Sequence, residues 1–310
     1  MNRRSNQPQR RGFVMLTTLG VMSVASIVAI SAALVGRHAV YEGSARVELE
    51  RGRWIAMGCE RRAEAVIDSL LRDAPTLEDG ALIWRTLGRR VETSALVAGC
   101  DLSLDAAGTR LDVNAASQEM ITNLLIATGA GDRAAEMSDA LADWRDADDD
   151  ALPLGAERGW YDSAGRLLPR NGAIADLGEL RRVRGFEDLA GLDSVLSTVP
   201  GRVSLATAPV TVLMAIPGIT RETAEQIVAM QDAGTPLNNL LSVTGMVSQA
   251  SISALAARYP DAVRATTPDP DAWLIRVRAA RGLPTVSVRL EWRVIRSGRR
   301  CLVAGTRSVL

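Results

Sequence analysis

An uncharged stretch of 24 residues, 13–36, constrains this chain more than any other feature of the sequence. As an α-helix at ~1.5 Å per residue, such a stretch spans about 36 Å, more than the ~30 Å hydrocarbon core of a bilayer. A buried helix of a soluble domain seldom runs this long without a polar face. A cleaved secretory signal is a better rival, but its apolar region is usually about 7–15 residues. The sequence therefore predicts a single membrane-spanning helix over residues 13–36.

The charges on either side of this stretch predict its orientation. Four arginines and no acidic residue precede it: Arg3, Arg4, Arg10 and Arg11. Mixed charges follow it, beginning with Arg37 and Glu42. Because basic flanks stay in the cytoplasm, we expect a cytoplasmic N-terminus, a single pass through the membrane and a body on the far side.

The join between the arginines and the apolar stretch has a specific form. A short basic leader ends in Gly12 and is followed directly by Phe13 and the long apolar helix. This arrangement resembles the leader of type IV prepilins, over residues 1–12. The resemblance implies that a prepilin peptidase cuts after Gly12 and methylates Phe13, leaving the helix on the mature protein. Most such proteins carry glutamate at the fifth mature position, where this chain has Thr17; among type II secretion pseudopilins, the minor subunit K is known for lacking it.

Helical periodicity continues beyond the membrane segment. Apolar residues recur at three- and four-residue spacing between Ile55 and Leu71, forming one stripe, and Pro75 ends the pattern. A helix over residues 13–72 would be about 90 Å long. We expect its second half to pack on a sheet.

Strand patterns flank a long helical region. Residues 100–105 and 109–113 surround Ala-Ala-Gly, which predicts a β-hairpin. Residues 286–294 alternate apolar and polar, and residues 273–279 and 301–309 give two further strands. The sequence thus predicts an α/β (α+β) pseudopilin fold: a long N-terminal helix on a small antiparallel sheet, with a large helical insertion. The expected parts are residues 37–113, the inserted helical domain 114–260, and the C-terminal strands 261–310.

The insertion contains two stretches with the outline of a helix-hairpin-helix, "ATGAGDRAAEMSDAL" and "AIPGITRETAEQIV". Such units can hold phosphates on backbone N–H groups, usually with basic help. Residues 114–145 carry a net charge of −3 and residues 203–232 a net charge of −2, so both repel a phosphate backbone. We expect protein-contact modules and no nucleic acid. A membrane-tethered DNA-binding protein of a competence-like system is the alternative.

An acidic run, "DWRDADDDALPLGAE", suggests a cation site. Asp146, Asp148, Asp150 and Glu157 stand at positions 1, 3, 5 and 12 of an EF-hand-like loop, although Ala151 replaces the usual glycine. Hard carboxylate oxygens at alternate residues suit calcium better than a transition metal. The alternative is an acidic helix end that is simply solvated.

Catalysis and redox chemistry find little support in the sequence. The single histidine, His38, lies just beyond the apolar stretch, and no serine or cysteine nucleophile of the body has a histidine partner, so we do not expect an enzyme. Of Cys59, Cys100 and Cys301, any two could form a disulfide in an oxidising compartment, and three free thiols fit equally well.

The middle of the chain is also similar to the type II secretion minor pseudopilin K family (general secretion pathway protein K). The matching stretches are "LDVNAAS", "LADWRDADDD", "GAERGWY", "LPRNGAIADLGELRRVRGF" and "TAPVTVLMAIPGI". The resemblance implies a calcium-binding protein at the pseudopilus tip, with the I and J minor pseudopilins, the major pseudopilin and the prepilin peptidase as partners. It implies a role in initiating and capping the pseudopilus for protein export across the outer membrane. The calcium ligands that it implies are Asp143, Asp146, Asp148, Glu157, Asn171 and Glu179, beside Asp150 from the loop spacing. A plain single-pass scaffold that keeps its leader remains a third possibility.

Overall fold

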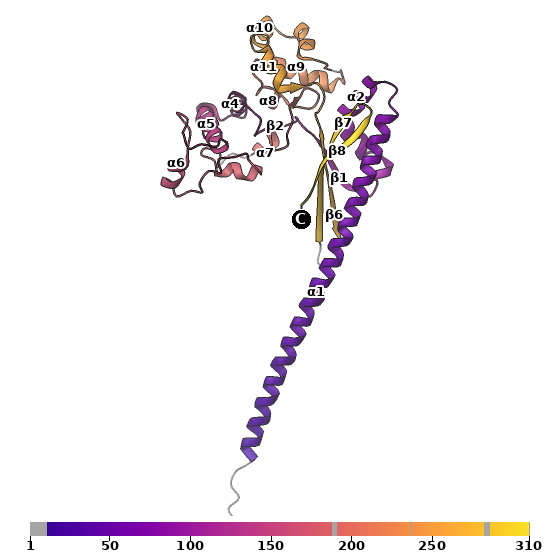
Figure 1. Cartoon of the computed structure of the whole chain (residues 1–310), viewed down its shortest axis with the longest axis vertical. Helices are drawn as coiled ribbons and strands as arrows, with labels where there is room; N and C mark the ends of the chain where they lie inside the picture. Colours follow the sequence, from indigo (N-terminus) through magenta and orange to yellow (C-terminus); the bar gives the residue numbers. More distant parts are fainter. Residues whose placement is uncertain (1–10, 188–190, 236, 282–285, 310) are drawn as a thin grey trace, which may run out of the picture.

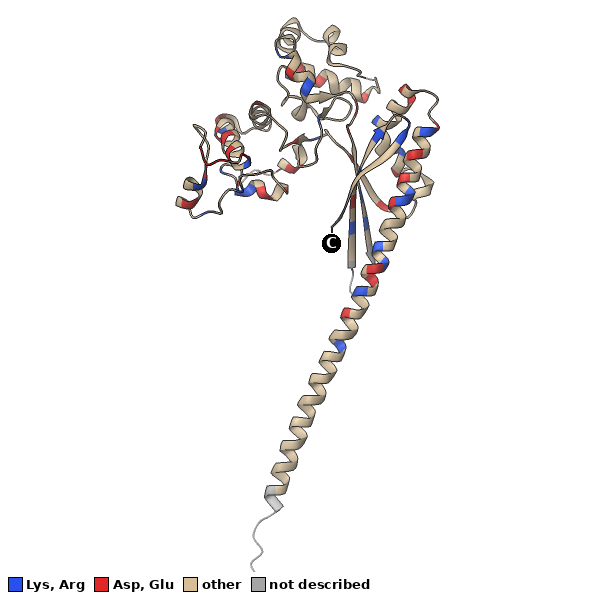
Figure 2. Cartoon of the chain, viewed as in Figure 1, with Lys and Arg blue, Asp and Glu red and all other residues tan. Residues whose placement is uncertain are grey.

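The long N-terminal helix predicted from the sequence is present. The computed structural model describes residues 11–187, 191–235, 237–281 and 286–309. Helix α1 runs over Arg11–Arg72, and its first half stands free of the rest of the molecule (Figure 1). An 18-residue window of this helix has a mean hydropathy of 2.2 and is not buried at all. Figure 2 shows a long uncharged stretch at the start of the described helix, residues 14–36, whereas charges follow one another from Arg37 onward. Residues 1–10 of the predicted leader lie outside the described residues.

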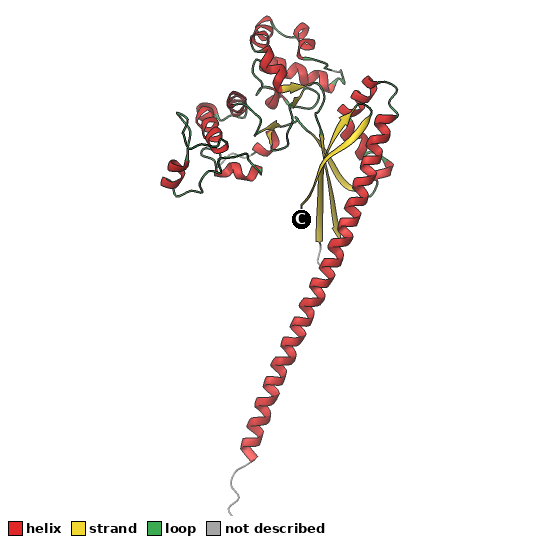
Figure 3. Cartoon of the chain, in the orientation of Figure 1, coloured by secondary structure: helices red, strands yellow, loops and turns green. Residues whose placement is uncertain are grey.

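The second half of α1 packs on a four-stranded antiparallel sheet (Figure 3). The sheet has the order β1-β6-β7-β8, with β1 Asp101–Ala106, β6 Trp273–Arg281, β7 Val286–Ser297 and β8 Arg300–Val309. The alternating residues Val288, Leu290, Trp292 and Val294 are buried, as their period of two predicts. Helix and sheet meet closely at Gly52, where an added Cβ would lie 2.9 Å from Val288 Cγ2. The three C-terminal strands confirm the sequence prediction.

Three short helices and a disulfide complete this part, which we call the body: residues 37–106 and 273–309. The short helices are α2 Leu77–Arg85, α3 Leu87–Glu92 and the 3₁₀ helix η1 Ala95–Val97. Thr76 begins α2 with a reciprocal capping box to Asp79. Cys59 of α1 and Cys100 before β1 form a disulfide with a Cα–Cα distance of 5.8 Å, and Cys301 is free. The sequence had left this pairing open.

The insertion, residues 107–272, leaves the sheet between β1 and β6. Its elements are β2 Leu111–Asp112, α4 Gln118–Ala127, η2 Gly131–Arg133, α5 Ala134–Arg145, α6 Arg158–Ser163, η3 Leu177–Arg182, α7 Leu192–Val195, β3 Leu196–Ser197, β4 Val203–Ser204, α8 Val210–Leu213, α9 Arg221–Asp232, η4 Leu240–Met246, α10 Gln249–Ala257, α11 Tyr259–Ala265 and β5 Thr266–Thr267. Figure 1 shows it at the end of the molecule opposite the free half of α1. The predicted architecture, a long helix on a small antiparallel sheet with a large helical insertion, is confirmed.

The predicted hairpin between residues 100–105 and 109–113 is wrong. Strand β1 pairs antiparallel with β6, more than 160 residues away, and β2 pairs parallel with β3 inside the insertion. Thr109 N donates to Ala106 O at 3.3 Å, so a turn is present, but the chain leaves the sheet there. Local turn chemistry therefore predicted the change of direction and missed the partner strand, which only tertiary pairing selects.

Candidate metal centre

The acidic run forms the end of one helix and the start of another. Asp143 lies in the last turn of α5, and Asp146 is the residue that ends this helix in an extended conformation. Glu157 precedes the first turn of α6, but its side chain makes no capping hydrogen bond. The loop between them folds back, so residues 14 positions apart come together.

Three carboxylates of this region form a cluster. Asp143, Asp146 and Glu157 each offer an oxygen within 4.8 Å of the other two. Asp143 is fully buried and Glu157 is 5% exposed, whereas Asp146 is partly buried. Three oxygens of the cluster are buried without any hydrogen-bond donor: Asp146 Oδ1 and both carboxylate oxygens of Glu157. Because buried charged oxygens are normally paired or bound to metal, this cluster has the composition of a cation site.

The loop backbone holds Asp143 in place. Leu152 N donates to both carboxylate oxygens of Asp143, at 3.2 and 3.3 Å. Gly155 passes so close that an added Cβ would lie 1.9 Å from Asp143 Oδ2. A side chain at position 155 would therefore fill the space beside the carboxylate cluster.

The electrostatics of the cluster favour a bound positive charge. Burial, followed by the neighbouring Asp143 and Asp146 charges, raises the pKa of Glu157 to about 7. Burial is also the main cause that raises the pKa of Asp143 and of Asp146, with nearby carboxylates adding to it. Like charges in one desolvated site oppose each other's ionisation, and a cation removes this opposition. The donor set contains only hard oxygens, which suit a divalent cation such as calcium or magnesium.

Asn171 adds a neutral oxygen next to the acidic loop. Its backbone adopts a left-handed conformation with φ of 48°. Its Nδ2 donates to Asp148 O at 2.7 Å and to Asp149 Oδ1 at 3.0 Å, so the side chain ties the loop down. Its Oδ1 is buried without a donor. The residues with orphaned oxygens are thus Asp146, Glu157 and Asn171, and all three were expected as ligands.

The remaining expected ligands lie outside the cluster. Glu179 is buried, but its oxygens accept hydrogen bonds from Trp144 Nε1 and Ala175 N, both at 3.1 Å. It therefore braces the tryptophan that follows Asp143. Asp148 and Asp150 are exposed, and Asp148 Oδ1 accepts a hydrogen bond from Asp150 N at 3.0 Å.

The second helix-hairpin-helix-like turn is covered by protein. Gly218 has φ of 84°, and an added Cβ would lie 2.9 Å from both Ala254 O and Arg258 Cβ. Helix α10 and the residue after it therefore pack closely against this turn. The first turn, around Gly129 and Gly131, has no such cover. The repeat itself stays a prediction.

Comparison with known proteins finds a matching family model, a curated relative and solved structures. A model of the family "Type II secretion system (T2SS), protein K" matches residues 95–200. The type II secretion system protein K of Klebsiella pneumoniae is 29% identical over 204 residues, which is 61% of this chain and 60% of that protein. The alignment thus spans about three fifths of the length of this curated relative.

A solved structure has the same fold. It is a chain in the crystal structure of the GspK-GspI-GspJ complex from the enterotoxigenic Escherichia coli type 2 secretion system, with a TM-score of 0.55 and 15% identity. The match covers 87% of this chain and 99% of that chain. The family match includes the acidic loop, and the fold match includes the insertion. Together these findings show that the chain is similar in sequence to type II secretion system protein K over residues 95–200 and shares the fold of the solved structure.

Proposed function

We propose that this chain acts at the tip of the type II secretion pseudopilus, where it initiates and caps the filament during protein export across the outer membrane. The observation that carries the proposal is the geometry of α1. One uninterrupted helix of 62 residues joins an apolar half to a half that packs on the sheet. The bulky insertion lies at the opposite end, where it would obstruct the addition of further subunits on that side.

The N-terminus is proposed to be processed by a prepilin peptidase after Gly12, with methylation of Phe13. Removal of the arginines of residues 1–12 leaves an apolar helix that remains in the inner membrane. Thr17, which stands where a glutamate is usual, donates its hydroxyl to Val14 O at 2.9 Å. This polar group is therefore satisfied inside its own helix, as a lipid environment requires.

The body and insertion are proposed to lie in the periplasm. The Cys59–Cys100 disulfide supports this orientation, because disulfides form and persist in oxidising compartments and are rare in the cytosol. Calcium is the proposed occupant of the cluster of Asp143, Asp146 and Glu157, with Asn171 as a neutral ligand. When bound, the cation would neutralise the buried carboxylates, while Leu152 N and Asn171 Nδ2 hold the loop around it.

Other minor pseudopilins, of the I and J types, are the proposed partners. The related solved structure is a complex of three such proteins, GspK, GspI and GspJ. In this chain, Trp54 lies on the half of α1 beyond the apolar segment and is 70% exposed. Exposed tryptophans are frequent centres of protein interfaces. We propose that a partner helix covers this side chain.

Two experiments test the proposal. Mass spectrometry of the chain taken from cell membranes should find an N-terminal peptide that begins with methylated Phe13. A chain that still begins at Met1 would instead support a scaffold that keeps its leader. Co-purification in detergent with the I- and J-type pseudopilins of the same organism should succeed and should weaken at least about tenfold for Trp54→Ala. The matched control is Leu77→Ala, because Leu77 of α2 is 65% exposed and lies off α1. Equal recovery of both variants would refute the Trp54 interface.

A further inference from the structure

The body and the insertion have separate hydrophobic cores. One cluster of buried side chains contains only residues of 56–104 and 273–294, and the other contains only residues of 111–262. The covalent link between them is two adjacent chain segments, at the end of β1 and the start of β6, where Ala107 N donates to Ala272 O at 2.8 Å. Two modules that share no apolar core and are joined at one point are expected to move relative to each other.

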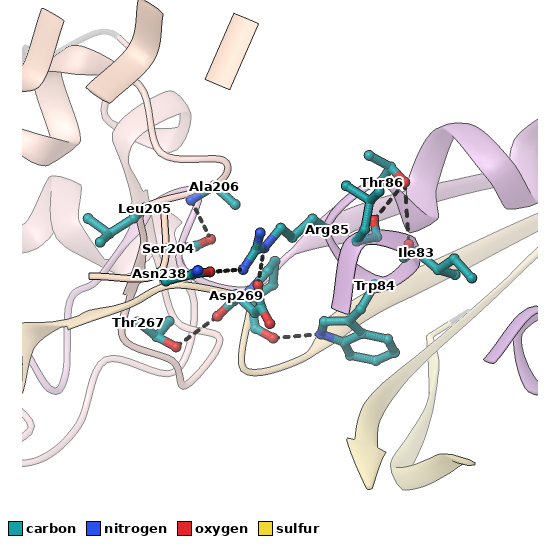
Figure 4. Close-up of polar contacts among 12 residues, drawn as sticks. Ile83, Trp84, Arg85, Thr86, Ser204, Leu205, Ala206, Asn238, Thr267 and Asp269 are labelled. Carbon is teal, nitrogen blue, oxygen red and sulfur yellow. Dashed lines mark hydrogen bonds and ion pairs between the residues drawn. The ribbon is translucent and has the colours of Figure 1, made fainter. Parts of the chain in front are cut away.

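The junction between the modules is polar and is centred on Asp269 (Figure 4). Asp269 lies in the segment that returns from the insertion to β6. One of its oxygens accepts a hydrogen bond from Arg85 Nε, at the end of α2, and the other lies 3.4 Å from Arg296 Nη2 of β7. Arg85 also donates from Nη2 to Asn238 Oδ1 of the insertion at 3.2 Å. Two arginines of the body thus hold one carboxylate of the returning segment.

A tryptophan continues the same contact. Trp84 Nε1 donates to Pro270 O at 2.7 Å, and Trp273 Nε1 donates to Trp84 O at 2.9 Å. Beside these bonds is a cavity of about 90 Å³ lined from both modules, by Leu82 of the body and by Leu205 and Leu237 of the insertion among others. This space is partly open to solvent and its lining residue Leu82 is 43% exposed, so no continuous apolar core crosses the junction here. The hydrogen bonds and ion pairs, and not apolar packing, therefore fix the angle between the modules.

We propose that this junction is a hinge, and that the Arg85–Asp269–Arg296 contact is the clamp that locks it. The side chains of the clamp are 13%, 21% and 23% exposed, so solvent screens their attraction only in part. Release of the clamp leaves two folded modules on a two-segment connection, and the insertion then pivots relative to α1. This inference concerns the chain by itself and does not depend on the proposed place of the protein at a filament tip.

Distances between spin labels on the two modules test the hinge in the full-length chain in detergent. Cysteines replace Leu77 of α2 and Leu241 of η4, which are 65% and 54% exposed, and Cys301→Ser removes the free thiol. The clamped chain should give one narrow distance distribution. Arg85→Ala combined with Arg296→Ala should broaden it about twofold or more. The matched control is Arg258→Ala, which removes ion pairs to Glu119 and Asp261 within the insertion and should leave the distribution narrow.

A second variant guards against misfolding of the double mutant. Asp269→Asn keeps the shape of the side chain and removes the charge that the two arginines share. It should broaden the distance distribution as the double mutant does, while the tryptophan fluorescence of both cores stays native. An unchanged narrow distribution in Asp269→Asn, or equal broadening in Arg258→Ala, would overturn the clamp.

Discussion

Substitution of Glu157 by glutamine tests the metal centre. The substitution should raise the stability of the folded chain without calcium and lower it when calcium is bound. In the folded, metal-free chain, burial and the neighbouring Asp143 and Asp146 raise the pKa of Glu157 from 4.5 to about 7. Because one pKa unit corresponds to about 1.4 kcal/mol, ionisation of this buried carboxyl at pH 8 costs about 3 kcal/mol relative to the unfolded chain. Glutamine cannot ionise and therefore avoids that cost.

The direction of the pH dependence follows from the raised pKa. A group whose pKa is higher in the folded state binds its proton more tightly there, so its contribution to stability is fully present below pH 4.5. The contribution is lost as the pH rises through 7. The metal-free wild-type chain should therefore lose stability between about pH 4.5 and 7, and Glu157→Gln should remove most of that loss. Asp143 and Asp146 titrate in the same direction, since their pKa values are raised as well.

Calcium should reverse the order of stability. At a free concentration of 1,000 times Kd, binding stabilises the wild-type chain by about 4.1 kcal/mol, which exceeds the cost of about 3 kcal/mol that glutamine avoids. Glu157→Gln lacks one of the three carboxylates of the cluster and should gain much less. The variant is thus expected to be the more stable protein in chelator at pH 8, and the less stable one in calcium.

Thermal unfolding of the detergent-solubilised chain, followed by tryptophan fluorescence, measures both effects. Trp144 is buried beside the site and reports on the insertion. A difference of 3 kcal/mol corresponds to a shift of roughly 6–12 °C for a module of this size. The control is Asp150→Asn, in the same loop but exposed, which should behave like wild type in both conditions. Two results would refute the reasoning. One is a Glu157→Gln chain that melts below the wild type in chelator at pH 8, and the other is a rise in its melting temperature with calcium as large as that of the wild type.

Three further substitutions probe the fold. Cys100→Ser removes a disulfide with a sequence separation of 41, so the greater chain entropy of the unfolded state should lower the free energy of unfolding by about 4 kcal/mol. Urea unfolding measures this loss, and a loss below about 1 kcal/mol would contradict a stabilising role of the disulfide. Gly155→Ala places a Cβ against Asp143 and should weaken calcium binding, measured by calorimetry, at least about tenfold with the body still folded. Gly218→Ala forces a side chain at φ of 84° against Ala254 O and should lower the free energy of unfolding of the insertion by about 2 kcal/mol or more, while the body transition stays unchanged.

Local periodicity made most of the body predictable. The uncharged stretch and the apolar stripe beyond it predicted α1, and the two-residue alternation of β7 predicted the buried face of the sheet. These signals lie within one element each. The partner of β1 was missed because it is β6, more than 160 residues away, and a nearby turn offered a plausible but wrong partner. The two-residue strands β2 to β5 are too short to give a pattern.

The acidic loop was predictable in composition but not in geometry. Loop spacing selected Asp146 and Glu157, which lie in the cluster, but also Asp148 and Asp150, which the structure leaves exposed. The family resemblance added Asp143, which is fully buried in the cluster. Sequence spacing cannot show which carboxylates turn inward, because the chain turns at Pro153 and Leu154 and not at position 151, which an EF-hand would use. Burial of oxygens without donors is a three-dimensional signal with no counterpart in the sequence.

The body and the insertion are stabilised in different ways, and both ways depend on the proposed periplasmic location. The body carries a disulfide between α1 and the segment before β1, and the insertion carries the carboxylate cluster. Disulfides are rare where the environment is reducing, and the proposed calcium site would gain stability only where that cation is available. In a reducing, cation-poor compartment the body would lose its cross-link, and Glu157 would remain buried near other negative charges. A chain held on the cytoplasmic side should therefore be less stable in both modules than the same chain after translocation, and the hinge between them lets each module reach its final stability separately.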